Sequence, residues 1–507
     1  MENLMGQGDF ITATPESVGV PSSAITKFVR SLQDHSLCMH SILVFRRGKL
    51  IAEGYAPPFD AQRRHRMYSI SKSFTALGIG LMTQEGKLGL DDRIVDHFPE
   101  YAPGPVHPFI AEATIRDMLT MRDCHDETSA GLADWFSTPP THPPGTVFLY
   151  NTTCTNLMCA IIEKISGGTL MEYLYPRLLE PIGFTPGCMC IRGSWGYSWS
   201  GSGIICTPRD LAKVAMVCMN SGRWGEKQLI NESFIREATS RQVDNAINGS
   251  DLEHQSGYGY QIWRTRHNGF AFLGMGTQLA VALPEQELLL VTTADTQGVA
   301  NAGSIVLRSF WETVLASLSG GASAELGALP EDAEAQAEQC SLPEDADAQA
   351  ELGAVMGGLK LTTSAGAHSS PTAGVISGKT YRLFDEDCGW RDVRFDFEGD
   401  GGRLVYTNRR GAKEIPFGFG HNKFFVFPET HYPGIELKKP AGRGYEAYAS
   451  AGWVDDRTLS VMCYIADDYF GSLHINAVFD GNRVTLFLKK TAEFFLDDYA
   501  GWSYGYC

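Results

Sequence analysis

Apolar residues along the first 317 positions follow two different patterns. After Pro21 they recur three and four residues apart, which predicts an amphipathic helix. Residues 41–55 form two apolar runs around a glycine turn, as expected for a β-hairpin. Residues 279–293 form a second hairpin, whose almost continuously apolar strands we expect to be buried on both faces. Helices and hairpins without a repeating strand–helix–strand order predict an α+β fold.

The pattern changes in the last part of the chain. Residues 376–507 contain short runs of alternating apolar and polar residues, separated by glycine and asparagine turns. This spacing predicts an antiparallel β-barrel or sandwich. Residues 318–375 are rich in Ala, Glu and Asp, and residues 324–332 and 342–354 form an imperfect duplication, so we interpret this stretch as a solvated linker with some helix. The predicted domains are residues 1–317, 318–375 and 376–507.

Composition argues against several classes of protein. The net charge of −17 disfavours nucleic acid or an anionic membrane as the main partner, although nine acidic residues fall within residues 322–354. No apolar run is long enough to span a membrane, and the N-terminal residues show no secretory signal. The 12 cysteines follow no framework spacing and have no Cys or His partners at metal-ligand spacing. We therefore expect a cytoplasmic protein with reduced thiols and without a metal or other cofactor.

The clearest chemical signal lies at the start of an apolar helix, where Ser69 and Lys72 are three residues apart. At this spacing the two side chains share one helix face. The free N–H groups of the first helical turn point toward whatever the serine attacks. A nucleophile, a neighbouring amine and unpaired donors are parts that acyl transfer needs. The Ser-x-x-Lys pattern is common by chance, but this lysine lies in an otherwise apolar run, which a solvated helix face would not show.

Two groups could accept the proton of Ser69. Lys72 could do so if its apolar surroundings favour the neutral amine, and a tyrosinate held near Lys72 could do the same work. The candidate is Tyr150, which follows the Pro-Gly turn at 144–145 and precedes a predicted helix, although a Tyr-Asn pair is more often a surface turn. A second oxyanion donor is expected from the glycine-bearing run 272–278, which a plain turn or bulge would explain equally well.

In their order and spacing, these motifs resemble the serine β-lactamase-like hydrolases. The resemblance rests on residues 69–72, on residues 144–150 and on the strand that ends at Pro284, and it spans roughly residues 12–317. The superfamily includes class C β-lactamases, D-alanyl-D-alanine carboxypeptidases, D-aminopeptidases, esterases and 6-aminohexanoate-dimer hydrolases. The resemblance implies a β-lactamase/transpeptidase-like fold, with a central antiparallel sheet, a helical subdomain and the active site between them.

The resemblance also implies roles for individual residues. Ser69 would be the nucleophile, Lys72 its proton partner and Tyr150 the general base and acid, which we expect to be held deprotonated near Lys72. The Ser69 N–H and an N–H of a strand would form the oxyanion hole. Counting back from Pro284, Met275 falls where the 6-aminohexanoate-dimer hydrolases place this strand, so the Met275 N–H is the expected second donor. The expected substrate-binding residues are Thr152, Gly274 and Gly276.

Two departures from class C β-lactamases change the expected substrate. Where those enzymes have Tyr-x-Asn, this chain has Tyr150-Asn151-Thr152, and where they have Lys-Thr-Gly, it has no Lys or His. The missing cation removes the usual partner of a substrate carboxylate. We therefore predict a serine hydrolase of the carboxylesterase or amidase type. It would cleave a small ester, amide or short peptide through an acyl-enzyme on Ser69, with 6-aminohexanoate-dimer hydrolases and esterases as the nearest relatives in motifs.

Other functions stay open at this point. One alternative is a penicillin-interacting β-lactamase, D-alanyl-D-alanine peptidase or D-aminopeptidase, and another is a non-catalytic relative that only binds a ligand. The C-terminal β-domain resembles the barrel-like appendages of some D-aminopeptidase and esterase relatives. The sequence leaves open whether this domain covers the active site, supports a homodimer or binds something separate.

Overall fold

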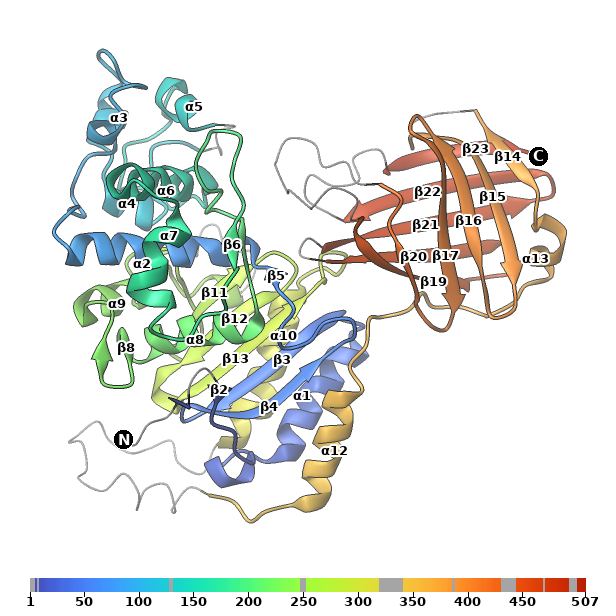
Figure 1. The fold of residues 1–507 in the computed structure, drawn as a ribbon, viewed down its shortest axis with the longest axis horizontal. Helices are drawn as coiled ribbons and strands as arrows, with labels where there is room; N and C mark the ends of the chain where they lie inside the picture. Colours follow the sequence, from blue (N-terminus) through green and yellow to red (C-terminus); the bar gives the residue numbers. More distant parts are fainter. Residues whose placement is uncertain are drawn as a thin grey trace. The chain divides into compact units, whose positions relative to one another are not determined.

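The computed structural model of the chain describes residues 5–6, 9–126, 131–246, 252–318, 341–384, 388–429, 444–467, 470–491 and 499–507. These residues form two compact units, Met1–Lys360 and Leu361–Cys507, which we describe separately (Figure 1). The predicted fold class is confirmed, because helices pack on an antiparallel sheet in the first unit and the second unit is a β-barrel.

An antiparallel sheet forms the centre of the first unit, with the strand order β10-β11-β12-β13-β3-β4. The pairing of β13 with β3 joins the two predicted hairpins, and places Leu290 opposite Val44. Alternate residues of β12 and β13 belong to hydrophobic clusters on opposite faces, so this hairpin is buried on both faces as predicted. The strands are β3 (Met39–Arg46), β4 (Lys49–Tyr55), β10 (Trp263–Arg264), β11 (Phe270–Gly274), β12 (Gln278–Leu283) and β13 (Leu288–Ala294).

Helices cover both faces of the sheet. On one face, α1 and α10 meet where the rings of Phe28 and Phe310 pack edge to face, 5.3 Å apart. On the other face, α2, α6 and α8 share a larger cluster with β11 and β13. The helices are α1 (Ser22–Asp34), α2 (Ser71–Gln84), α3 (Pro108–Glu112), α4 (Ile115–Leu119), α5 (Leu132–Ser137), α6 (Thr152–Ser166), α7 (Leu170–Leu174), α8 (Pro208–Met219), α9 (Glu232–Thr239) and α10 (Ala302–Phe310). Two short strand pairs and a three-stranded sheet (order β5-β7-β6) complete the unit; their strands are β1 (Met5–Gly6), β2 (Asp9–Phe10), β5 (His65–Arg66), β6 (Met189–Cys190), β7 (Ile204–Cys206), β8 (Arg223–Trp224) and β9 (Lys227–Gln228).

The predicted linker was expected to contain some helix, and its described part, residues 341–375, contains a helix that is packed rather than solvated. Helix α12 (Ala346–Gly357) packs beside α1 (Figure 1), and its Leu352 and Met356 are buried in the same cluster as α1 and β4. The acidic composition of the segment hid this packing from the sequence analysis. A few apolar residues on one face of a helix are enough to bury that face against neighbouring elements, even when the other faces are acidic. Residues 319–340, which include the first copy of the duplication, lie outside the described residues.

The second unit is a closed β-barrel, which decides between the barrel and the sandwich that the sequence predicted. Antiparallel pairs run from β17 through β16, β15, β14, β23, β22, β21 and β20 to β19, and a parallel pair of β17 with β19 closes the ring. Residues before the predicted boundary at 376 belong to it, since Ala367 exchanges backbone hydrogen bonds with Trp453. Its elements are α13 (Pro371–Ile376), β14 (Thr380–Leu383), β15 (Trp390–Glu398), β16 (Gly401–Asn408), β17 (Gly411–Phe419), β18 (Lys423–Val426), β19 (Glu446–Trp453), β20 (Thr458–Ala466), β21 (Phe470–Asp480), β22 (Arg483–Thr491) and β23 (Gly501–Tyr506).

Three further properties concern the described residues only. None of their helices combines the length and the apolar character needed to cross a bilayer. Their cysteines are free thiols, and all except Cys188 and Cys507 are buried. No three of their His, Cys, Asp or Glu side chains gather in a group that could hold a metal ion.

Two buried histidines connect the sheet to the segment that leads into α2. His40 Nδ1 on β3 and His65 Nε2 on β5 are 2.8 Å apart, and His65 Nδ1 is 3.0 Å from the Arg66 carbonyl oxygen. If the His65 Nδ1–H is donated to that carbonyl, its Nε2 must be unprotonated to accept the His40 Nδ1–H. Burial lowers the pKa of His65 to about 4, and burial and the neighbouring His65 lower the pKa of His40 well below its usual value.

Acid is expected to destabilise the first unit through this pair. The pKa of His65 is about 4 in the fold and about 6.5 in the unfolded chain, so between these values the unfolded chain binds more protons. Stability therefore falls as the pH falls through this window, by about 2 kcal/mol between pH 7 and pH 5 from His65 alone. His65→Gln keeps an acceptor for His40 and a donor for the Arg66 carbonyl without titrating, so it should reduce this loss. Urea unfolding at both pH values measures the effect, and equal acid dependence in both proteins would contradict it.

Candidate active site

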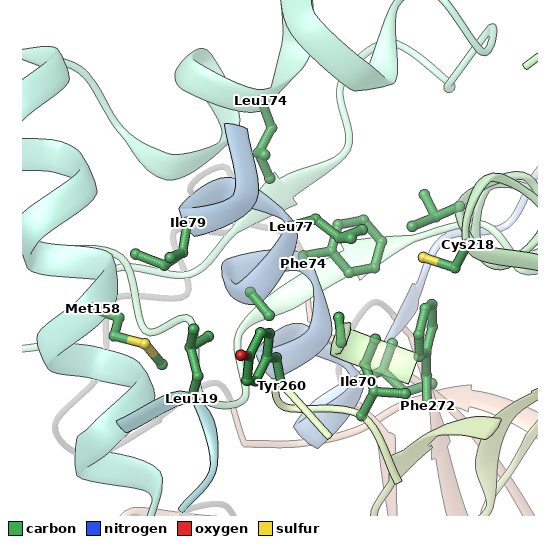
Figure 2. Packing of buried hydrophobic residues seen from close by; sticks show 14 of the residues in the cluster. Ile70, Phe74, Leu77, Ile79, Leu119, Met158, Leu174, Cys218, Tyr260 and Phe272 are labelled. Atoms are coloured by element: carbon green, nitrogen blue, oxygen red, sulfur yellow. The ribbon is translucent and has the colours of Figure 1, made fainter. Parts of the chain in front are cut away.

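The segment that carries Ser69 is held firmly on all sides. Ser69 lies in a short 3-10 turn (Tyr68–Ile70) that leads directly into α2, and the first twelve residues of α2 are buried. Figure 2 shows α2 surrounded by apolar side chains, among them Met158 of α6, Cys218 of α8 and Phe272 of β11. A helix in such surroundings cannot shift without disturbing close-packed neighbours. The packing therefore fixes the direction from which Ser69 is presented.

The residue before the serine has an unusual backbone. Tyr68 is buried and has a φ of 48°, in the left-handed region that a non-glycine residue seldom adopts. The Arg66 guanidinium lies over its ring, 4.4 Å from the centroid, and holds it in place. Such backbone strain occurs at functional sites, where the surrounding structure compensates for it. Here it turns the chain sharply just before Ser69.

Lys72 is placed directly beside the serine. Its Nζ donates hydrogen bonds to Ser69 Oγ at 3.0 Å and to the Gly201 carbonyl at 2.6 Å. The side chain is only 1 % exposed, although it carries an amine. Its Nζ also lies over the Tyr150 ring, 5.0 Å from the centroid. The two residues of the Ser-x-x-Lys motif and Tyr150 thus come together from α2 and from the loop before α6.

The Tyr150 side chain lies beside Ser69, close enough for the serine hydroxyl to lower the pKa of Tyr150 slightly. The ring stacks on Trp263, with centroids 5.5 Å apart, and meets Tyr258 edge-on. Although 38 % of the side chain is exposed, burial of its hydroxyl end raises the pKa of Tyr150, and the interaction with Ser69 only partly offsets this. This shift argues against the expected resting tyrosinate, because the loss of solvent around the hydroxyl disfavours the anion.

The residue after Tyr150 has a structural role. Asn151 is the N-cap of α6: its Oδ1 accepts from the Thr153 N–H at 2.9 Å. Its Nδ2 donates to the buried Asp123 carboxylate at 3.1 Å, which also accepts from Trp135 Nε1 at 3.0 Å. A satisfied N-cap stabilises a helix start by about 1 kcal/mol. Asn151 thereby fixes the end of the loop that carries Tyr150.

The predicted oxyanion strand approaches the serine segment closely. Gly274 ends β11, and a Cβ added there would lie 2.3 Å from the Met67 carbonyl oxygen, so only glycine allows this approach. Met275 follows, with its side chain 41 % exposed. Gly276 continues the turn with a φ of 78°, and the Gln278 side chain holds the turn by donating to the Met275 carbonyl at 2.9 Å.

The predicted substrate-binding residues fall into two places. Gly274 and Gly276 lie on the turn after β11, whereas Thr152 lies in the first turn of α6, beside Gly201. A Cβ added to Gly201 would lie 2.3 Å from the Thr152 methyl group. The contact of Thr152, Gly274 and Gly276 with a substrate stays a prediction.

Sequence reasoning missed several residues that shape the site. Gly201 accepts the hydrogen bond from Lys72, and Asn156 on α6 accepts from the Gly201 N–H at 3.1 Å. The sequence had indicated loop 194–203 as part of the acyl pocket but not its path, and so not the role of Gly201. Gln278 was also missed, although a polar residue at the head of an apolar strand is a signal that its side chain has a buried partner.

Comparison with known proteins agrees with this geometry. A family model described as Beta-lactamase matches residues 27–305, which is more than half of the chain. The 6-aminohexanoate-dimer hydrolase of Paenarthrobacter ureafaciens is 22 % identical over 292 residues, covering 52 % of this chain and 74 % of that protein. Protein flp of Staphylococcus aureus is 24 % identical over 170 residues, which are 29 % of this chain but only 33 % of flp.

A similar fold occurs among solved structures. A penicillin-binding protein homologue from Caulobacter crescentus superposes with a TM-score of 0.50 at 17 % identity, covering 61 % of this chain and all of that one. At this identity the likeness concerns the fold alone. Together with the family match, it confirms the predicted serine β-lactamase-like resemblance. The chain belongs to the beta-lactamase family.

Proposed function

We propose that this protein is a serine hydrolase that cleaves a small neutral ester or amide through an acyl-enzyme on Ser69. The observation that carries the proposal is the convergence of two proton-transfer groups on one hydroxyl. Lys72 Nζ lies 3.0 Å from Ser69 Oγ and 5.0 Å from the centroid of the Tyr150 ring, and the Tyr150 hydroxyl interacts with the same serine. A serine with a positioned base and a positioned acid has what nucleophilic catalysis requires.

The raised pKa of Tyr150 supports a division of labour. Lys72, as the neutral amine, would take the Ser69 proton while Oγ attacks the substrate carbonyl carbon. Backbone N–H groups of Ser69 and Met275 would stabilise the oxyanion of the tetrahedral intermediate. The Tyr150 phenol would then donate its proton to the leaving group as the bond to that group breaks, and Lys72 would return a proton to the phenolate. Water would be activated in the same way to release the acyl group.

Two features support a neutral, largely apolar substrate. The run that precedes β12 has no Lys or His where class C enzymes carry the cation of Lys-Thr-Gly. Two exposed side chains of the candidate site, Tyr150 and Met275, offer apolar surface and no charge. The curated relative is named for a 6-aminohexanoate dimer, so amides belong in the substrate screen beside esters.

Covalent labelling tests the proposal. Wild-type protein treated with a small alkyl fluorophosphonate should gain the mass of one adduct, located on Ser69 by peptide mapping. Ser69→Ala should gain none, and it should also lose all turnover of p-nitrophenyl acyl esters. A wild type that forms no adduct, or a Ser69→Ala protein labelled as fully as wild type, would refute the proposal.

A β-lactam-directed activity is the second candidate, because the family match and the fold of a penicillin-binding protein homologue favour it. The missing cation on the β11–β12 turn argues against it. Nitrocefin separates the two functions. Turnover of nitrocefin at a rate similar to that of the best neutral ester would establish the second candidate, whereas ester turnover alone would leave the first.

A further inference from the structure

The Gly201 carbonyl is the second partner of Lys72, and it is the shorter contact. Lys72 Nζ donates to it at 2.6 Å, against 3.0 Å for Ser69 Oγ. A lysine side chain has four rotatable bonds, so one hydrogen bond to the serine alone would leave its amine poorly fixed. The position of the Gly201 carbonyl therefore determines where the amine sits relative to the serine.

Helix α6 holds the loop that carries this carbonyl. Three contacts run along the helix: Glu163 Oε1 accepts from the Ser198 N–H at 3.2 Å, the Thr155 carbonyl accepts from Ser200 Oγ at 3.3 Å, and Asn156 Oδ1 accepts from the Gly201 N–H at 3.1 Å. Asn156 and its neighbours are buried, so water does not compete for these groups. Of the three contacts, only that of Asn156 acts on a backbone atom of Gly201 itself.

The other side of the loop is held by a buried cation. Arg66 Nε donates to the Ser202 carbonyl at 3.0 Å, and another guanidinium nitrogen donates to Ser202 Oγ at 3.1 Å. The guanidinium also lies over the Trp199 ring, 4.5 Å from the centroid. Gly201 is thus confined between Asn156 on α6 and Ser202, which Arg66 fixes. A side chain at Gly201 would collide with Thr152 and Asn156, which leaves the peptide little room to move.

The same helix begins immediately after Tyr150. Asn151 is the N-cap of α6, and Asn156 lies in its second turn. One rigid element therefore carries both the phenol that meets Ser69 and the contact that fixes the acceptor of Lys72. This arrangement keeps the two proton-transfer groups in a constant relation to each other.

We propose that Asn156 is a positioning residue for acyl transfer: it holds the N–H of Gly201, the residue whose carbonyl in turn holds the Lys72 amine beside Ser69. The inference rests on the proposed serine hydrolase function. A displacement of about 1 Å at a catalytic group can cost on the order of a hundredfold in rate. Loss of the Asn156 contact should therefore slow the acylation step, while substrate binding, which does not involve Lys72 directly, should change little.

Three variants test the proposal with a p-nitrophenyl acyl ester. Asn156→Leu removes the acceptor at similar size and should lower kcat about 10- to 100-fold with KM changed less than about twofold. Asn156→Asp keeps an accepting oxygen and should recover kcat to within about fivefold of wild type. Ser200→Ala removes the neighbouring contact of the same loop and should keep kcat within about threefold. Circular dichroism and Tm of each variant report on folding.

The outcomes separate the possible explanations. A wild-type kcat in Asn156→Leu, or an equal loss in Ser200→Ala, would overturn the positioning role, because the loop would then matter only as a whole or not at all. If Asn156→Leu does not fold, Asn156→Ser, which is too short to reach the Gly201 N–H, takes its place with the same expected loss. If wild type forms no Ser69 adduct, it is the proposed hydrolase function that fails.

Discussion

Lys72→Met is expected to slow acylation of Ser69 by about 10³-fold or more, at the upper end of what a positioned general base contributes. Methionine has nearly the length of lysine and suits the buried site, which is 1 % exposed, so the fold should be kept. What is lost is the amine 3.0 Å from Ser69 Oγ. The measurement is the rate of adduct formation with a fluorophosphonate, followed by intact mass over time.

The variant Lys72→Arg tests whether Lys72 acts as a base or only supplies a positive charge. Arginine keeps the charge but does not lose its proton in proteins, so it cannot accept the Ser69 proton. We expect this variant to be as slow as Lys72→Met. Lys87→Met, at an exposed lysine beyond the end of α2, should label at a rate within about twofold of wild type. Near-normal labelling of Lys72→Arg would contradict the role of Lys72 as base.

Tyr150→Phe is expected to affect amides far more than activated esters. If the Tyr150 phenol protonates the leaving group, an anilide or alkyl amide should lose about 10²- to 10⁴-fold in kcat, because an amine cannot leave without a proton. A p-nitrophenyl ester, whose leaving group departs as a stable anion, should lose less than about tenfold. Steady-state kinetics of one acyl group on both leaving groups gives the comparison.

The same comparison of amide and ester could also refute the role of Tyr150 as the acid that protonates the leaving group. An equal loss of kcat on the amide and on the ester would mean that Tyr150 acts as the base in the attack of Ser69. That is the role that the sequence predicted for a tyrosinate. The raised pKa of Tyr150 argues for the phenol, and its cause is burial of the hydroxyl end. Tyr258→Phe, at a buried ring beside Tyr150, serves as the control for disturbed packing, and it should affect both substrates equally.

Two helices of the first unit, α2 and α6, position the residues of the candidate site. Helix α2 carries Lys72 and follows directly on the 3-10 turn of Ser69, and helix α6 carries the loop end at Tyr150 and the contact to Gly201. The two helices pack closely, since a Cβ at Gly78 of α2 would lie 2.9 Å from the Ile162 side chain of α6. Close packing of this kind allows the two helices little movement relative to each other. The geometry around Ser69 is thus set by helix packing rather than by flexible loops.

Local pattern alone predicted much of the first unit. The helix after Pro21, the two hairpins and the apolar helix that begins at Ser71 all lie where periodicity indicated. These features depend on residues within a few positions of one another, so a short window of sequence contains the information. The placement of Lys72 beside Ser69 is of the same kind, because their spacing on one helix decides it.

Other features could be seen only in the folded structure, because they depend on contacts between segments far apart in the sequence. The pKa of Tyr150 depends on how much solvent its hydroxyl loses among neighbours from other elements, and no nearby residue in the sequence reveals that. The docking of α12 depends on an apolar surface offered by α1 and β4, hundreds of residues earlier in the chain. The sequence by itself thus determined the elements and the Ser69–Lys72 pair. Only the tertiary structure decided which acceptor fixes Lys72 and in which direction the pKa of Tyr150 shifts. Both depend on burial and on contacts between segments far apart in the chain.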